Sequence, residues 1–191
     1  MKKLKKERDI FLGIVARYAI LLLVPVLSFL LLGNFMGIFY AIFWPLTAYP
    51  AKFILGFFYQ TLLVGDFLIV GNFATQIIDA CIAGSAYFLL FILVMTTSGI
   101  SLLKRIKMII FTFALLLLMN IARIVLMIFL GINFPMSFDI THKLFWYGLS
   151  TIFVVFVWFF SAWLFKIKEI PVYSDIKFLI SKSTSKSIKK K

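Results

Sequence analysis

The sequence predicts an all-α polytopic membrane protein. Hydrophobic residues make up 63% of its 191 positions and aromatic residues 18%, and the mean hydropathy is +1.09. Soluble domains contain only about 45–50% apolar residues. Four apolar stretches approach the roughly 17 to 25 residues that cross a hydrocarbon core: Ile10–Leu32, Ile82–Thr97, Ile106–Leu130 and Leu144–Phe165. We therefore expect about four transmembrane helices in one membrane catalytic domain, residues 1–170, followed by a basic cytoplasmic tail, residues 171–191.

Basic residues gather near the two ends of the chain. The formal net charge is +13, and of the twenty Lys and Arg residues five lie in "MKKLKKERD" and eight follow Leu164. Basic clusters beside apolar spans are typical of the cytoplasmic side, next to anionic lipid headgroups. We therefore expect a multi-pass protein of the plasma membrane with both termini in the cytoplasm. The lipid bilayer explains the charge, so no nucleic-acid partner is predicted.

The first apolar stretch, Ile10–Leu32, follows a basic segment, as the apolar region of a signal peptide does. It is too long for such a region and lacks a clear small-residue cleavage site. We therefore expect a retained transmembrane helix that starts on the cytoplasmic side.

The segment 35–60 is apolar enough to span the membrane but contains two prolines and Lys52. Basic residues place both the N-terminus and the loop before Ile106–Leu130 on the cytoplasmic side. Two crossings, Ile10–Leu32 and Ile82–Thr97, already satisfy both constraints. We therefore expect a broken interfacial or re-entrant helix pair on the outer face, with a kinked fifth span as the alternative.

Two short β-prone runs precede the second span. Phe67–Val70 and Phe73–Ile78 flank the dipeptide Gly71-Asn72. Glycine at the first central position and asparagine at the second fit a two-residue hairpin turn. A lone hairpin is marginally stable in water, so we expect it to rest on the helices or the membrane surface just before Cys81.

The only cysteine, the only histidine and an arginine deep in an apolar span are predicted to lie at one level of the outer leaflet. Cys81 lies at the outer end of the second span. Arg123 lies seven residues before Leu130, which is about 10 Å at 1.5 Å per residue. His142 lies in the predicted outer loop before the fourth span. This convergence is the main functional signal in the sequence.

These residue types suit a cysteine nucleophile. A reactive cysteine needs thiolate character, which a histidine, a cation or a helix N-terminus supplies. His142 can take the thiol proton, and Arg123 can stabilise a thiolate or an oxyanion. Asn120 lies one turn before Arg123, so its amide can hold the guanidinium or a substrate carbonyl, or can form a polar clasp between helices.

Each of these residues also has a purely structural interpretation. A free cysteine among apolar neighbours usually packs as a small hydrophobe, and a loop histidine can simply be solvated. Arg123 differs, because a cation at the centre of an apolar span costs about 3 kcal/mol on insertion scales. Its side chain leans toward the helix N-terminus, away from the outer surface, which disfavours snorkelling.

The chain lacks the motifs of other hydrolases and of metal or nucleotide sites. We find no HExxH, GxSxG, glycine-rich phosphate loop, Cys/His cluster or spaced pair of intramembrane aspartates. We therefore predict no cofactor and no bound metal. One cysteine also excludes an intrachain disulfide.

Three sequence blocks occur in the order found in a known family of membrane enzymes. They are "IDACIAG", "NIARIVL" and "DITHKLFWYG", and as a set they resemble the exosortase/archaeosortase family of membrane-embedded cysteine transpeptidases. The resemblance implies that Cys81 is the nucleophile, Arg123 the catalytic arginine and His142 the base. It also implies supporting roles for Asp79, the acidic residue of the first block, and for Asn120.

The resemblance covers roughly Leu62 to Phe165 and departs from the family pattern at one place. The family has serine or threonine and then glycine after the cysteine, whereas this chain has Ile82 and Ala83 before Gly84. The departure removes a hydroxyl beside the nucleophile and implies a different oxyanion geometry.

The resemblance implies that the protein cleaves C-terminal sorting signals of membrane-anchored surface proteins on the outer face. Such a signal has a short motif, a transmembrane helix and a basic tail. The acyl group would pass through a thioester on Cys81 to an amine or lipid acceptor, or to water; the residues do not separate transfer from hydrolysis. The alternative is a non-catalytic assembly factor or small-solute permease with Arg123 and Asn120 in a polar cavity.

Overall fold

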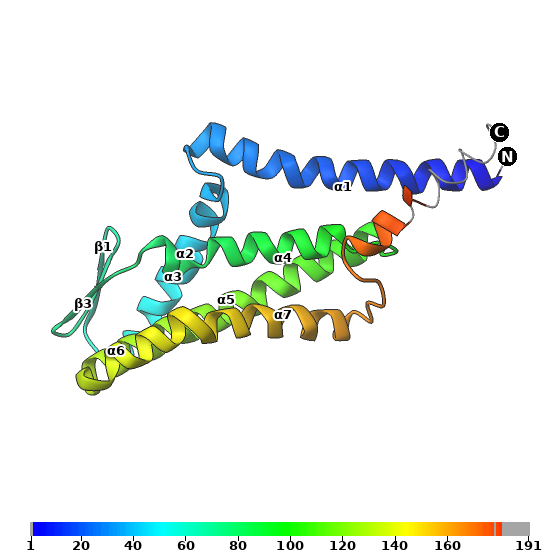
Figure 1. Cartoon of the computed structure of the whole chain (residues 1–191). Helices are drawn as coiled ribbons and strands as arrows, with labels where there is room; N and C mark the ends of the chain where they lie inside the picture. The colour runs from blue at the N-terminus through cyan, green and yellow to red at the C-terminus, as the bar shows by residue number, and fades with distance from the viewer. Residues whose placement is uncertain (1, 178, 181–191) are drawn as a thin grey trace.

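The computed structural model describes residues 2–177 and 179–180 and is mostly helical (Figure 1). In chain order its elements are α1 (Lys2–Leu32), α2 (Gly37–Leu55), β1 (Thr61–Val64), β2 (Phe67–Val70), β3 (Phe73–Gln76), α3 (Asp79–Ile82), α4 (Gly84–Thr96), α5 (Leu102–Asn133), α6 (Pro135–Leu144), a π-helical turn (Phe145–Leu149) and α7 (Ser150–Leu164).

The helices have a common direction that defines two ends of the molecule. Figure 1 shows α1, α4, α5 and α7 running along this direction, with α2 crossing it. The strands and α6 lie at one end, which we call the sheet end. The start of α1 and the connection between α4 and α5 lie at the other, which we call the basic end. Cys81, in α3, therefore lies toward the sheet end.

Three helical segments are long and apolar enough to cross a membrane: Ile10–Leu32, Gly37–Leu55 and Leu102–Asn133. They indicate a membrane protein, as the composition predicted. The other two predicted spans contain the shorter apolar helices Gly84–Thr96 and Ser150–Leu164. One is shortened because Ala83 has a left-handed backbone, with φ of 59°, and the other begins after the π-helical turn.

Helix α2 contradicts the prediction of a broken helix pair in segment 35–60. It is one helix of 19 residues that continues through both prolines. An interior proline removes a backbone hydrogen bond and costs about 3 kcal/mol, so other contacts must hold the helix. Its buried residues recur every four positions, at Phe39, Phe43, Thr47, Ala51 and Leu55. Burial of this stripe against the core stabilises the helix despite the prolines.

The sheet confirms the predicted hairpin and adds a strand. β2 and β3 are antiparallel with Val70 opposite Phe73, and Gly71 has φ of 57°. β3 ends at Gln76, earlier than predicted. β1 pairs with β2 through a second two-residue turn, in which Gly65 has φ of 56°. Glycine adopts positive φ without a Cβ clash, which is why both turns begin with it.

The expected loop around His142 is instead helix α6, so the loop assignment is wrong. Pro135 occupies the first turn of α6, where its missing N–H has no partner to lose. No strong helix breaker follows before Gly148. The helical path therefore runs from Pro135 through the π-helical turn into α7, and His142 lies in the last turn of α6.

The core lies between α2, α4 and α5. The rings of Phe43 and Tyr87 stack with centroids 3.6 Å apart, and Phe113 meets them edge-on at 5.5 and 5.4 Å. Leu55, Leu90 and other side chains continue this buried cluster. Because α2 and α4 pack here, the short helix α3 between the sheet and α4 is held against α2 and α5.

Two arginines, Arg105 and Arg17, hold the basic end together. Arg105 is 5% exposed and donates to the carbonyls of Val94, Met95 and Thr97, at 2.8 Å for the last two. Arg17 donates to the same Thr97 carbonyl at 3.0 Å. Both arginines thus satisfy carbonyls that have no partner at the C-terminal end of α4.

The predicted tail, residues 171–191, begins with a packed segment. Asp175 is 2% exposed and forms a 2.8 Å ion pair with Arg17. The remaining tail residues, 178 and 181–191, lie outside the described residues. The chain therefore stays attached to α1 at least as far as Asp175.

Candidate functional site

Cys81, Arg123 and His142 line one cavity of about 160 Å³ at the sheet end. They come from α3, α5 and α6, which the packing of those helices and β3 brings together. The Cys81 thiol is free and half-buried, and His142 is exposed. The His142 ring stacks on Phe138 with centroids 5.7 Å apart and an angle of 10°. Phe138 thus fixes the ring at the cavity wall.

A break in the helix shapes the backbone around Cys81. The Cys81 amide donates to the carbonyl of Ile78 at 2.8 Å, and α3 ends after one turn because Ala83 is left-handed. Gly84 then begins α4, where an added Cβ would lie 2.5 Å from the Tyr40 ring. A side chain at Gly84 would therefore push α4 away from α2.

The break leaves carbonyls of α3 without helical partners, and α5 supplies donors for them. In a continuous helix the carbonyl of Cys81 would accept from the amide four residues later. Instead it accepts from Asn120 Nδ2 at 2.8 Å and from Arg123 Nη2 at 3.1 Å. Arg123 Nη2 also donates to the Ala80 carbonyl at 3.2 Å. The two α5 side chains therefore fix the position of the Cys81 backbone.

Arg123 also connects this turn to α7. Its Nη1 donates to Ser150 Oγ at 3.0 Å, and Ser150 Oγ donates to the carbonyl of Phe145 at 2.6 Å. Phe145 begins the π-helical turn, three residues after His142. Ser150 was not among the residues predicted from the sequence, because its only signal is a hydroxyl at the start of an apolar run. The Arg123 guanidinium thus joins the α3 turn, which contains Cys81, to α7 and to the π-helical turn that follows His142.

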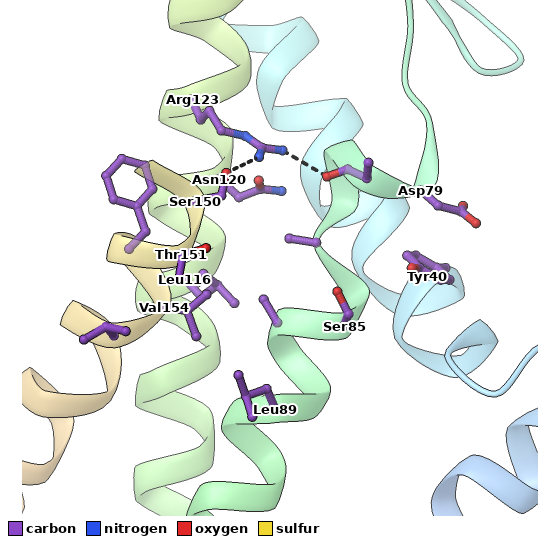
Figure 2. Close-up of a pocket in the computed structure, with 15 residues that line it drawn as sticks. Tyr40, Asp79, Ser85, Leu89, Leu116, Asn120, Arg123, Ser150, Thr151 and Val154 are labelled. Carbon is purple, nitrogen blue, oxygen red and sulfur yellow. Dashed lines mark hydrogen bonds between the residues drawn. The ribbon is translucent and has the colours of Figure 1, made fainter. Parts of the chain in front are cut away.

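A second cavity, of about 420 Å³, shares Arg123 and Ala80 with the first. Figure 2 shows it between α4, α5 and α7, with Asn120 and Arg123 at one end and Leu89 and Val154 farther along. The Asp79 carboxylate points away from Arg123 (Figure 2). Asp79 therefore lies at the cavity edge and does not bind the Arg123 guanidinium. An ion pair with Arg123 would have been one simple way for Asp79 to support the site.

This arrangement brings together the groups that acyl transfer through sulfur requires. It combines a thiol, an imidazole and a guanidinium on one small cavity, next to a larger, mainly apolar one. Within residues 2–177 and 179–180, no group of three or more His, Cys, Asp or Glu side chains could hold a metal ion.

Comparison with known proteins found no relative: no family model, curated protein or solved structure matches the chain. The geometry of the cavity that Cys81, Arg123 and His142 line is therefore the basis for a functional proposal.

Proposed function

We propose that the chain is a membrane cysteine transpeptidase or protease that cleaves C-terminal sorting signals of surface proteins. The shared cavity of Cys81, Arg123 and His142 carries the cysteine chemistry in this proposal, and the substrate class follows from the resemblance of the three sequence blocks to the exosortase/archaeosortase family. The three side chains come from segments up to 61 positions apart and include the chain's only thiol and only imidazole. Their presence on one cavity supports thiol chemistry.

Catalysis would start with proton transfer from the Cys81 thiol to His142. The thiolate then attacks the carbonyl carbon of the scissile peptide and forms a C–S bond. An arginine has five N–H donors, so the three hydrogen bonds from Arg123 to the protein leave donors for the oxyanion of the tetrahedral intermediate. When the C–N bond breaks, protonated His142 gives its proton to the amine leaving group.

The resulting thioester would be resolved by an amine or lipid acceptor, or by water. His142 takes a proton from the incoming nucleophile, and the new bond forms at the same carbonyl carbon. The C–S bond then breaks, and the leaving sulfur of Cys81 takes the proton from His142. The protein returns to its starting state without a cofactor. Transfer and hydrolysis use the same residues and differ only in which nucleophile reaches the thioester.

The proposed orientation places the sheet end outside and the basic end in the cytoplasm. Basic clusters lie in the first nine residues, in the α4–α5 region and after Leu164, as the positive-inside rule requires of cytoplasmic segments. Four crossings account for the directions in Figure 1: α1, α3 together with α4, α5, and the π-helical turn together with α7, with α2 lying across them in the outer interface. This would put Cys81 beside the outer surface, where sorting motifs arrive.

A non-catalytic membrane protein is the second candidate, and one observation favours it. Asn120 and Arg123 bind backbone carbonyls of α3, which is a sufficient structural reason for both polar residues in an apolar helix. In that case the sulfur of Cys81 serves only packing. The two candidates therefore differ in what happens when the sulfur is removed.

Replacement of Cys81 tests the proposed function. In cells that carry Cys81→Ala, surface proteins ending in a shared motif, one span and a Lys/Arg tail should keep their C-terminal segments. Cys81→Ser should retain only a trace of processing, because a hydroxyl ionises far less readily than a thiol. Mass spectrometry of surface-protein C-termini measures this. The control is Ser101→Ala at the exposed start of α5; normal processing by correctly inserted Cys81→Ala would leave the non-catalytic candidate.

A further inference from the structure

A separate cavity of about 1000 Å³ lies at the basic end. α1, the start of α5 and the segment 168–177 surround it. Figure 1 shows that segment, in orange, between the start of α1 and the ends of α4 and α7. The cavity shares no residue with the two cavities that Arg123 lines, so it is a different site.

The cavity wall is divided into an apolar part and a charged part. The apolar part consists mainly of isoleucines from α1 and α5, namely Ile10, Ile14, Ile20, Ile106 and Ile109. The charged part holds four cations and two carboxylates: Arg17, Arg105, Lys168, Lys177, Glu169 and Asp175.

The two carboxylates of the charged part balance only two of its four cations. Asp175 pairs with Arg17, and Glu169 accepts a hydrogen bond from Ser174. Lys168 and Lys177 are exposed, and neither has a hydrogen bond or an ion pair to any residue that the structure describes. The cavity therefore presents two available ammonium groups beside the apolar wall.

We propose that this cavity binds one anionic phospholipid, whose phosphate lies between Lys168 and Lys177. The acyl chains would lie along the isoleucines of α1 and α5. A soluble anion would leave that apolar wall without a partner, and a zwitterionic lipid would add no net charge for the lysines to attract. The proposal follows from this division of the wall and does not depend on the proposed function.

Gly13 offers a way to test the apolar part without changing charge. It lies on the cavity wall, and a Cβ added there would meet nothing within 4 Å. Gly13→Phe should therefore place a ring in the space assigned to an acyl chain, while α1 keeps its backbone. The charged and apolar parts can thus be altered independently.

The test is native mass spectrometry of the full-length protein in detergent with added phosphatidylglycerol or phosphatidylcholine of identical chains. Phosphatidylglycerol should bind at least tenfold more tightly. Lys168→Gln/Lys177→Gln should weaken it about 10- to 30-fold, because each lysine near an anionic headgroup contributes roughly 1 kcal/mol and 1.4 kcal/mol is tenfold. Gly13→Phe should reduce binding of both lipids.

The matched control is Lys104→Gln/Lys107→Gln, which removes the same charge from the start of α5 at residues that do not line the cavity. It should change phosphatidylglycerol binding less than threefold. Equal losses in both double variants would overturn the proposal in favour of general surface attraction. Equal affinity for the two lipids, or equally tight binding of glycerol phosphate, would also overturn it.

Discussion

At the scale of single residues, the sequence predicted which side chains share the site but not what they bind. Cys81, Arg123 and His142 could be grouped because span lengths place them at one depth. The carbonyls that Arg123 holds could not be foreseen, since they become available only where Ala83 adopts positive φ. An alanine in the sequence does not indicate a positive φ, because that conformation usually favours glycine. Ser150 was missed for a related reason: its role depends on the neighbouring π-helical turn.

Arg123→Lys should abolish processing, although the positive charge remains. A guanidinium donates to the Ala80 and Cys81 carbonyls and to Ser150 at once, whereas a lysine ammonium lacks that planar fork. We expect a loss of at least 10²-fold in turnover of a tagged substrate, the usual size for loss of an oxyanion donor. Ser150→Ala is the matched comparison, because it removes one of the three bonds and should cost less. Equal activity of Arg123→Lys and the wild type would contradict this role.

At the scale of elements, the presence of helices and of the hairpin was predicted better than the points at which a helix is interrupted or continues. Apolar length identified α1 and α5, and the Gly71-Asn72 dipeptide identified the β2–β3 hairpin. β1 was missed even though Gly65-Asp66 is a turn signal of the same kind. The course of α2 could not be read from its prolines, because the stripe of buried residues that opposes their effect is a property of tertiary packing.

Gly84→Ala tests the close packing of α2 on α4. Alanine normally stabilises a helix relative to glycine by up to about 1 kcal/mol, but here its Cβ would lie 2.5 Å from the Tyr40 ring. We expect a net destabilisation of about 1–3 kcal/mol, typical of overpacking, seen as a lower Tm in detergent. Gly148→Ala, with nothing within 4 Å of the new Cβ, should not lower the Tm.

A double-mutant cycle separates this clash from other effects of Gly84→Ala. If the Tyr40 ring is the obstacle, Gly84→Ala should be far less destabilising in a Tyr40→Ala background. The same loss of stability in both backgrounds would rule out the contact as the cause.

At the scale of the whole molecule, composition was enough to predict a helical membrane protein with two chemically different ends. The attachment of the tail was not predictable, because "SDIK" reads as polar and solvated while Asp175 is in fact buried against Arg17. A single carboxylate in a basic tail is a weak signal until its partner is known. Asp175 therefore shows how far packing extends beyond the predicted end of the membrane domain.

The proposed orientation predicts opposite labelling of the two ends. In a Cys81→Ala background, Asn72→Cys in the exposed β2–β3 turn should react with an impermeant thiol reagent in intact cells. Ser101→Cys, exposed before α5, should react only after permeabilisation, because the proposed orientation places the basic end in the cytoplasm. The reverse pattern would place the proposed site in the cytoplasm.

In the proposed mechanism, Cys81 carries the acyl group of a cleaved substrate. His142→Ala should slow turnover by roughly 10²- to 10⁴-fold, typical of a lost general base, because both the formation and the resolution of the thioester need the imidazole.

The most direct measurement is therefore the intact mass of the wild-type protein, denatured in acid while it turns over a tagged substrate. We predict an added mass equal to the substrate's N-terminal fragment, located on Cys81 by peptide mapping and removed by neutral hydroxylamine. Cys81→Ala and His142→Ala should carry no such mass, because one lacks the sulfur and the other lacks the base that forms the thiolate. An unmodified Cys81 in the wild type, while the substrate is still cleaved, would rule out a thioester on Cys81.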